Sequence, residues 1–185
     1  MVGIDFGKPL FTREEIQRKI QEIGSRISTD YADKDLLVVG ILKGALFFMS
    51  DLLRSLKISV RMDFIHCTSS SSKGGSGNPV QMLCDMKEDI KDKHVLLVED
   101  IMDSGVTLKY LKEMLLERGP ASLKVCALLD KADRRQVPIE ADYVGFRIPN
   151  KYVVGYGLDY RQRFRNLPFV ATVRSDVLQQ QTPAE

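Results

Sequence analysis

Three acidic residues lie close together at the end of an apolar run in the segment VLLVEDIMDSGVTL, residues 95–108. Glu99 and Asp100 directly follow the run, and Asp103 comes shortly after them. Carboxylates repel one another and are costly to bury, so we expect a function to require them here. Two adjacent acids can accept hydrogen bonds from two sugar hydroxyls, and they attract a divalent cation directly or through water.

The residues that follow, Asp103-Ser104-Gly105-Val106-Thr107, are suited to bind a phosphate group. They lie between an expected strand and an expected helix, and a helix N-terminus offers backbone N–H donors and the positive end of the helix dipole. Ser104 and Thr107 add hydroxyl donors, and Gly105 permits a tight turn. The lysine-containing P-loop pattern is absent. Taken alone, these residues fit an ordinary helix cap equally well.

The acids and the loop together predict a pocket for a ribose 5-phosphate group. Glu99 and Asp100 would accept hydrogen bonds from ribose hydroxyls, while the loop would hold the phosphate. A magnesium site of the response-regulator kind is the alternative, because carboxylates at a strand end also suit that ion. This alternative leaves the Ser-Gly-x-Thr sequence of residues 104–107 unexplained. The ribose-phosphate interpretation is therefore preferred.

Apolar patterning predicts the elements that position these residues. A capping box, Thr12-Arg13-Glu14-Glu15, precedes isoleucines at helical spacing and predicts an amphipathic helix. Strands buried on both faces, as in a parallel sheet, are expected where short continuous apolar runs occur, at 35–42, 94–99 and 122–129. Helices are expected at 45–56 and 108–118, and further strands at 58–67, 143–148, 152–156 and 167–173.

The alternation of strands and helices predicts an α/β fold with an open, mainly parallel sheet flanked by helices. Ligands of such sheets bind beyond the carboxyl ends of the strands. Lys43-Gly44, the 99–107 segment and Lys131 are all expected at that edge. The length predicts one domain over residues 1–176, followed by a polar tail at 177–185.

Composition and charge argue against several classes of protein. No apolar run approaches the roughly 20 residues of a membrane span, and the N-terminus lacks the pattern of a secretion signal. The net charge of +2 is too small to favour general nucleic-acid binding. The cysteines contain no CxxC pair, so we expect buried reduced thiols and a cytoplasmic protein; they are Cys67, Cys84 and Cys126.

The segment TSSSSKGGSGNP, residues 68–79, contains no apolar residue. A loop of this length within a compact domain is typical of a lid or a binding loop. A plain linker between strands is the alternative, and composition does not separate the two interpretations.

The segment VEDIMDSGVTL resembles the signature of phosphoribosyltransferases that bind phosphoribosyl pyrophosphate (PRPP). Three more segments, LKGALFF, LLDKADRR and DYVGFRIPNKYVVGYGLDYRQRFRNLP, resemble one branch of that family, the hypoxanthine-guanine phosphoribosyltransferases. The similarity covers residues 11–173. It implies the type I phosphoribosyltransferase fold, with a small hood lobe formed by the N- and C-terminal segments. It also implies purine salvage, in which a phosphoribosyl group passes from PRPP to hypoxanthine or guanine and pyrophosphate is released.

The resemblance implies a role for each part of the acidic segment. Glu99 and Asp100 would hold the ribose 2′ and 3′ hydroxyls, and the 104–107 loop would bind the 5-phosphate. Asp103 would lie near purine N7 and act as general acid or base. It would be ionised at neutral pH, because a free aspartate has a pKa of about 3.9.

The resemblance also implies the residues that bind the base. Lys131 would donate to the 6-oxo group, which favours hypoxanthine or guanine over adenine, whose 6-amino group is itself a donor. Tyr152 would stack on the purine face, and the Val153 backbone would meet the edge of the base. Asp159 would lie beside the base, near a second metal ion and the pyrophosphate.

Pyrophosphate and metal binding are implied as well. Lys43 and Gly44 would give backbone N–H groups to the pyrophosphate after a cis peptide bond between Leu42 and Lys43, and Arg165 would bind the same group. One or two Mg²⁺ ions are the implied cofactor, with three acids as ligands, Glu99, Asp100 and Asp159. Relatives form dimers or tetramers, so a homodimer or homotetramer is expected.

The chain departs from the family pattern at two places. The family's lid carries a Ser-Tyr pair, whereas residues 68–72 read TSSSS. Val106 replaces a lysine found in some relatives, although backbone N–H groups can bind phosphate without it. Two other activities stay open, which are transfer to another base such as xanthine and a PRPP-sensing regulator on the same fold. The regulator is disfavoured because the chain has neither an added helix-turn-helix nor a strongly basic stripe.

Overall fold

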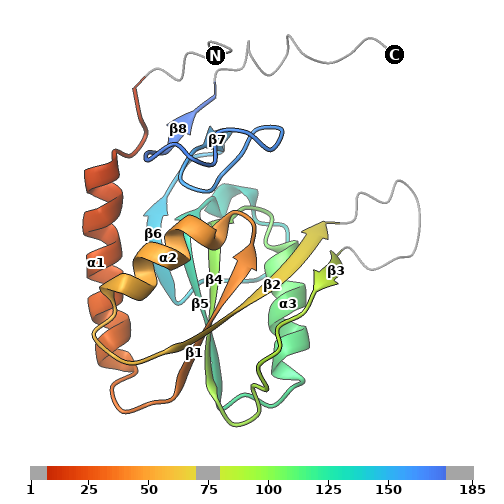
Figure 1. Cartoon of the computed structure of the whole chain (residues 1–185). Coiled ribbons are helices and arrows are strands. Elements are labelled where there is room, and N and C mark those ends of the chain that lie inside the picture. The colour runs from red at the N-terminus through yellow and green to blue at the C-terminus, as the bar shows by residue number, and fades with distance from the viewer. Residues whose placement is uncertain (1–7, 70–79, 174–185) are drawn as a thin grey trace.

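The computed structural model describes residues 8–69 and 80–173, and Figure 1 shows a twisted central sheet with helices packed on both faces. The predicted lid beyond Ser69 and the predicted tail at 177–185 lie outside the described residues. The helices are α1 (Arg13–Asp30), α2 (Ala45–Ser55) and α3 (Val106–Leu116), with a short 3₁₀ turn, η1 (Ala132–Arg134). The strands are β1 (Leu36–Leu42), β2 (Arg61–Ser69), β3 (Val80–Cys84), β4 (His94–Met102), β5 (Ser122–Asp130), β6 (Tyr143–Arg147), β7 (Val153–Val154) and β8 (Ala171–Thr172).

The main sheet has six strands in the order β3-β2-β1-β4-β5-β6. Every neighbouring pair is parallel except β2 and β3, which are antiparallel. The α1 and α2 helices pack on one face of this sheet and α3 on the other. The predicted fold class, an open and mainly parallel sheet flanked by helices, is therefore confirmed.

The first helix forms as its sequence predicts. The Thr12 hydroxyl accepts a hydrogen bond from the Glu15 N–H at 3.2 Å, and the Glu15 carboxylate accepts one from the Thr12 N–H at 2.8 Å. This reciprocal capping box satisfies two backbone donors that would otherwise lack partners at the helix start. The four isoleucines at helical spacing are fully buried against the sheet, namely Ile16, Ile20, Ile23 and Ile27.

The apolar runs of β1, β4 and β5 place alternate residues in two separate cores. Leu36 and Val38 of β1 pack in the core beneath α1 and α2, whereas Leu37 and Val39 pack in the core beneath α3. Such double burial explains why these strands read as continuous apolar segments rather than as an alternating pattern.

The β4 strand is longer than predicted, and this changes the position of the acids. It was expected to end at residue 99, but it continues to Met102, where it still pairs with Asp130 of β5. Backbone pairing with β5 therefore continues through the polar residues. Since side chains alternate along a strand, Glu99 and Asp100 project toward opposite faces of the sheet.

The first and last described segments of the chain meet above the main sheet. Phe11 forms a bridge with Val170, and β7 pairs with β8 in a separate two-stranded sheet. This arrangement forms the hood lobe that was expected (Figure 1). The strands predicted at 152–156 and 167–173 shorten to two residues each. The first ends where Gly155 (φ 96°) turns the chain.

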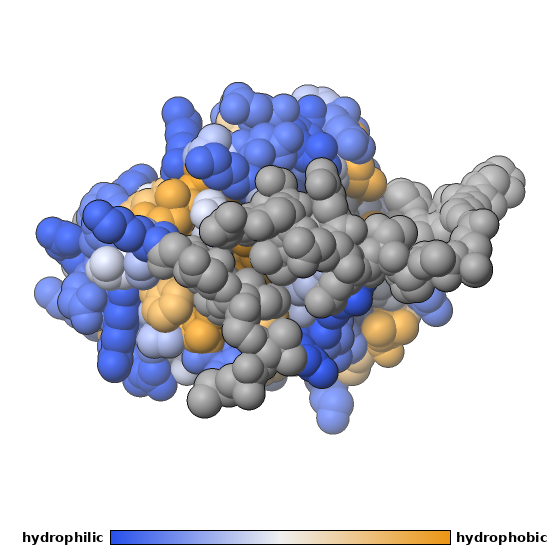
Figure 2. Space-filling model, turned by 90° about the horizontal axis from the view of Figure 1, so that it is seen from above, coloured by the Kyte–Doolittle hydropathy of each residue, from blue (hydrophilic) through white to orange (hydrophobic). Residues whose placement is uncertain are grey.

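Other boundaries differ modestly from the prediction. The α3 helix begins two residues early, at Val106, and ends at Leu116. The β3 strand was not predicted and forms an antiparallel hairpin arm with β2, which carries a bulge at His66/Cys67. Among the described residues, no helix is both long and apolar enough to cross a membrane. Figure 2 views the molecule from above, and most of the residues visible around its outline are hydrophilic.

Candidate active site

Two small pockets adjoin at the carboxyl ends of β1, β4 and β5. The first, here called the loop pocket, has a volume of about 220 Å³ and is lined by Glu99, Asp103, Ser104, Gly105 and Thr107, among others. The second, the tyrosine pocket, has a volume of about 230 Å³ and is lined by Asp100, Asp103, Lys131, Tyr152, Val153 and Asp159, among others. Asp103 and Ile101 line both, so Asp103 stands between them.

The loop pocket is shaped by a tight turn at the start of α3. Gly105 has φ 82° and is the N-cap residue of the helix. A Cβ atom here would lie 2.6 Å from Ile139 Cγ2 and 2.9 Å from Arg135 Cδ, which is too close. Glycine is thus required both for the backbone conformation and for the close approach of the 135–139 segment. The predicted position of the loop, between a strand and a helix N-terminus, is confirmed.

Asp103 is held by two cations. Lys131 Nζ donates to its Oδ2 at 3.0 Å, and Arg134 Nε donates to its Oδ1 at 3.2 Å. Burial alone would raise the pKa of Asp103, but the hydrogen bonds and charges of Lys131 and Arg134 outweigh burial and lower the pKa below its ordinary value. The Asp103 carboxyl is therefore ionised at neutral pH, as expected. Lys131 itself is buried, so this pair fixes its position.

The adjacent acids occupy different surroundings. Asp100 is 7% exposed, and its Oδ1 accepts a hydrogen bond from the Ile101 N–H at 2.8 Å. Glu99 faces the loop pocket together with Cys67. Burial raises the pKa of the Glu99 carboxyl well above its ordinary value, and the negative charge of Asp100 raises it further.

The Lys43-Gly44 segment reaches the site as predicted. The peptide bond between Leu42 and Lys43 is cis, which confirms that expectation. A Cβ atom on Gly44 would lie only 1.7 Å from Oδ2 of Asp100. On the other side, a Cβ atom on Gly157 would lie 2.0 Å from the Gly44 carbonyl oxygen. Two glycines thus bring the end of β1, the acid of β4 and the hood together.

The hood contributes the remaining predicted residues. Arg165 Nη1 donates to the Gly157 carbonyl at 2.7 Å, and its Nη2 pairs with Oδ1 of Asp159 at 2.6 Å. The Tyr152 hydroxyl donates to the Asp159 carbonyl at 3.1 Å, which holds the ring at the rim of the tyrosine pocket. The Tyr152 side chain is well exposed, whereas Val153 is buried.

The three predicted metal ligands do not gather at one point. Glu99 lines the loop pocket, while Asp100 and Asp159 line the tyrosine pocket. Asp159 Oδ2 also accepts from the Gln162 N–H at 2.7 Å. Across residues 8–69 and 80–173, no cluster of three or more acidic, cysteine or histidine side chains could hold a metal ion. Mg²⁺ commonly binds through only one or two protein carboxylates and completes its coordination with substrate oxygens and water.

Sequence reasoning missed two arginines near the acids. Arg134 binds the Asp103 carboxylate, and Arg135 Nη1 donates to the Asp103 backbone carbonyl at 2.5 Å. Both end the segment LLDKADRR, which was noted for its resemblance to the family, but a role was assigned only to Lys131, and a basic pair after an apolar strand is usually a solvated surface feature. The turn of η1 brings both side chains back toward β4.

Comparison with known proteins gives one consistent result. The phosphoribosyl transferase domain family matches residues 10–161. The chain is 43% identical to a hypoxanthine-guanine phosphoribosyltransferase from Streptococcus pneumoniae, over 96% of this chain and 98% of that protein. A hypoxanthine phosphoribosyltransferase structure from Staphylococcus aureus matches with a TM-score of 0.88 at 44% identity, covering 92% of each chain. One from Trypanosoma cruzi matches with a TM-score of 0.90 at 42% identity, covering 96% of each. The chain belongs to the phosphoribosyltransferase family.

Proposed function

We propose that this protein is a purine salvage enzyme that transfers the 5-phosphoribosyl group of PRPP to hypoxanthine or guanine and releases pyrophosphate. The observation that carries the proposal is the pair of adjoining pockets that share Asp103. One pocket contains the turn suited to phosphate, and the other contains a buried lysine and an exposed tyrosine. Substrates placed in both would meet beside the Asp103 carboxylate. Membership of the family and the names of the relatives support the same activity.

The ribose phosphate would occupy the loop pocket. Backbone N–H groups and hydroxyls of the 104–107 loop would bind the 5-phosphate at the N-terminus of α3. Glu99 would accept from one ribose hydroxyl on the loop side, and Asp100 from the other on the tyrosine side. The opposite orientations of the two acids along β4 support this division, because the ribose must bridge both pockets.

The purine would occupy the tyrosine pocket. The Tyr152 ring would stack on the base, and the backbone of Val153 would meet the edge of the base. An ammonium group has three N–H donors, and one of those on Lys131 is used by Asp103. Another would bind the 6-oxo group, which selects against the 6-amino group of adenine. The buried position of Lys131 supports this selectivity, since a solvated lysine would impose little.

Asp103 would act as the general base. Its carboxylate is ionised and lies between the two pockets, where it can accept the proton that the purine loses as the ring nitrogen attacks the anomeric carbon. Lys131 and Arg134 keep it ionised until then, and both would stabilise the developing charge around the base. The bond from the anomeric carbon to pyrophosphate breaks as the bond to the base forms.

The leaving pyrophosphate would lie between the loop that follows β1 and the hood. Backbone N–H groups of Lys43 and Gly44 and the guanidinium of Arg165 are the proposed donors. Bound Mg²⁺ would neutralise charge on the pyrophosphate. Asp100 and Asp159 fit this ion as partial ligands only, because they provide two carboxylates at one pocket and leave most coordination positions to substrate oxygens and water.

Self-association and a cytoplasmic location are the remaining parts of the proposal. Leu46 and Phe47, at the start of α2, are 45% and 38% exposed. Exposed apolar side chains beside the site support a homodimer or homotetramer. Sedimentation analysis would then give a mass of two or four times that of the single chain. The three cysteines are free thiols, which supports a reducing compartment. The expectation that they are buried is correct for Cys126 only, since Cys67 is partly buried and Cys84 is exposed.

The activity can be tested by following absorbance with PRPP, Mg²⁺ and each of hypoxanthine, guanine, xanthine and adenine. We expect nucleotide formation with hypoxanthine, guanine or both, and little with adenine. Formation of nucleotide only from xanthine would show that xanthine, rather than hypoxanthine or guanine, is the substrate. A good rate with adenine would contradict the role of Lys131, and no turnover with any base would contradict the enzyme itself.

A further inference from the structure

The segment after β5 clamps the backbone of the phosphate loop from behind. Arg135 Nη1 donates to the Asp103 carbonyl at 2.5 Å, and the Gln136 N–H donates to the Ser104 carbonyl at 2.9 Å. These two carbonyls are consecutive in the chain. The clamp therefore fixes two successive peptide planes at the start of the loop.

The orientation of those planes matters for phosphate binding. In a trans peptide the C=O and the following N–H point in opposite directions. When the carbonyls of Asp103 and Ser104 point toward the clamp, the N–H groups of Ser104 and Gly105 point away from it. Both residues line the loop pocket. The clamp thus aims two backbone donors at the position proposed for the 5-phosphate.

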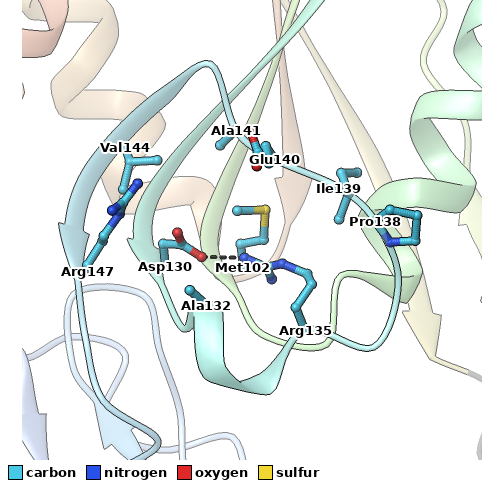
Figure 3. Close-up of a pocket in the computed structure, with 10 residues that line it drawn as sticks. All are labelled: Met102, Asp130, Ala132, Arg135, Pro138, Ile139, Glu140, Ala141, Val144 and Arg147. Carbon is cyan, nitrogen blue, oxygen red and sulfur yellow. Dashed lines mark hydrogen bonds and ion pairs between the residues drawn. The ribbon is translucent and has the colours of Figure 1, made fainter.

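Arg135 is itself held in place by Asp130 at the end of β5. Both residues line a cavity of about 580 Å³, and Figure 3 shows their side chains pointing at each other, joined by a salt bridge. Their side chains are 16% and 9% exposed. A guanidinium is planar and presents several N–H groups in a rigid fork. One arm binds Asp130 while the other binds the Asp103 carbonyl, which a single-headed cation could not do in the same geometry.

The same cavity offers a matched comparison. Arg147, on β6, also lines it, and in Figure 3 its side chain lies apart from the Asp130–Arg135 pair. Arg147 is exposed and, among the described residues, forms no hydrogen bond or ion pair with the 103–107 loop. The two arginines therefore share the cavity but differ in whether they bind the loop.

We propose that Arg135, anchored by Asp130, is a positioning residue for PRPP, which orients the backbone donors of the 104–107 loop without touching substrate. The proposal rests on the proposed transferase function. It predicts a selective loss of affinity for PRPP, because the purine contacts in the tyrosine pocket do not involve Arg135.

The test compares Arg135→Lys, Arg135→Gln and the control Arg147→Gln with the wild type. Lysine keeps a positive charge for Asp130 but cannot bridge to the Asp103 carbonyl, so we expect a stable protein. Each Arg135 variant should show a rise in KM for PRPP of about tenfold or more, the scale of one lost charge-assisted hydrogen bond. The KM for hypoxanthine should change less than threefold, and the control should match the wild type. For each protein, the unfolding midpoint and the calorimetric affinity for PRPP alone would also be measured.

The outcomes separate the two levels of the proposal. A wild type that binds PRPP but does not turn over contradicts the transferase function while still allowing the loop to be tested by calorimetry. Unchanged PRPP binding in folded Arg135→Lys and Arg135→Gln overturns the positioning role. Equal losses for PRPP and hypoxanthine, or an Arg135→Lys protein that does not fold, also overturn it, because each indicates general structural support.

Discussion

The contact between Gly44 and Asp100 makes the substitution Gly44→Ala a sharp test of the site. The added Cβ would lie 1.7 Å from Oδ2 and 2.5 Å from Cγ of Asp100, whereas ordinary contacts are 3.4–4 Å. The carboxyl must therefore move by more than 1 Å or the Gly44 backbone must withdraw. Asp100 is almost completely buried, so either movement disturbs the neighbouring atoms. Overpacking of this kind costs about 1–3 kcal/mol of stability.

Catalysis should be impaired by a free energy similar to the loss of folding stability, since each factor of ten in rate corresponds to about 1.4 kcal/mol. A displacement of about 1 Å at a reacting centre can lower the rate about 100-fold. Asp100 is proposed to hold a ribose hydroxyl and a metal ion, and Gly44 is proposed to bind pyrophosphate. We therefore expect kcat/KM for PRPP to fall about 10- to 100-fold, measured with saturating hypoxanthine.

Gly119→Ala is a suitable control for that prediction. Gly119 has a left-handed φ of 68°, but a Cβ there would meet no atom within 4 Å. It should cost about 1 kcal/mol of stability through backbone strain and leave the kinetics unchanged. A folded Gly44→Ala enzyme with wild-type kcat/KM would refute the placement of Asp100 and Gly44 in the site.

Three further changes test separate parts of the molecule. Asp103→Asn should lower turnover about 10²–10⁴-fold, the range of acid–base groups, while calorimetry shows PRPP affinity retained; unchanged turnover would remove Asp103 from catalysis. Because the pKa of Glu99 is raised in the folded protein, its stabilising contribution is present below the ordinary pKa of about 4.3 and is lost as pH rises through the raised value. In urea unfolding without ligands, Glu99→Gln should therefore exceed the wild type in stability at alkaline pH and match it in acid; parallel pH curves would contradict this. Burial alone would raise the pKa of Asp51, but hydrogen bonds from Tyr156, Gln17 and Arg54 lower it overall. The contribution of Asp51 to folding stability is therefore present above about pH 3.9 and is lost as pH falls through the lowered pKa. Asp51→Asn should cost about 1 kcal/mol at neutral pH, allowing for partial exposure, and the difference should close in acid; a constant difference would argue against an ionic contribution.

Most elements of the fold could be predicted because their burial follows a simple period. The isoleucines of α1 and the apolar runs of β1, β4 and β5 report burial directly, and βαβ connections fix the sheet as parallel. That Lys43, Asp103 and Lys131 lie along the same edge of the sheet follows from that topology. The exact end of β4 did not follow, because pairing with β5 continues through acids that a hydropathy pattern reads as the end of a strand.

The clamp behind the phosphate loop could not be predicted from the sequence. Arg134 and Arg135 follow β5 as an ordinary basic pair, and only the turn of η1 brings them to Asp103. The packing of Gly157 on the Gly44 carbonyl is likewise a contact between segments far apart in the chain. Such contacts depend on three-dimensional geometry, for which local spacing carries no signal. Of the lid predicted at 68–79, the first two residues belong to β2 and residues 70–79 lie outside the described residues.

The proposed transfer is tested most directly by the products of a single reaction. The purified protein would be incubated with hypoxanthine, PRPP and Mg²⁺, and nucleotide and pyrophosphate would be separated by chromatography and quantified over time. Transfer at the anomeric carbon predicts equal amounts of inosine monophosphate and pyrophosphate at every time point, and neither product when hypoxanthine is omitted. Pyrophosphate released without the nucleotide, or no reaction with any 6-oxopurine, would contradict it.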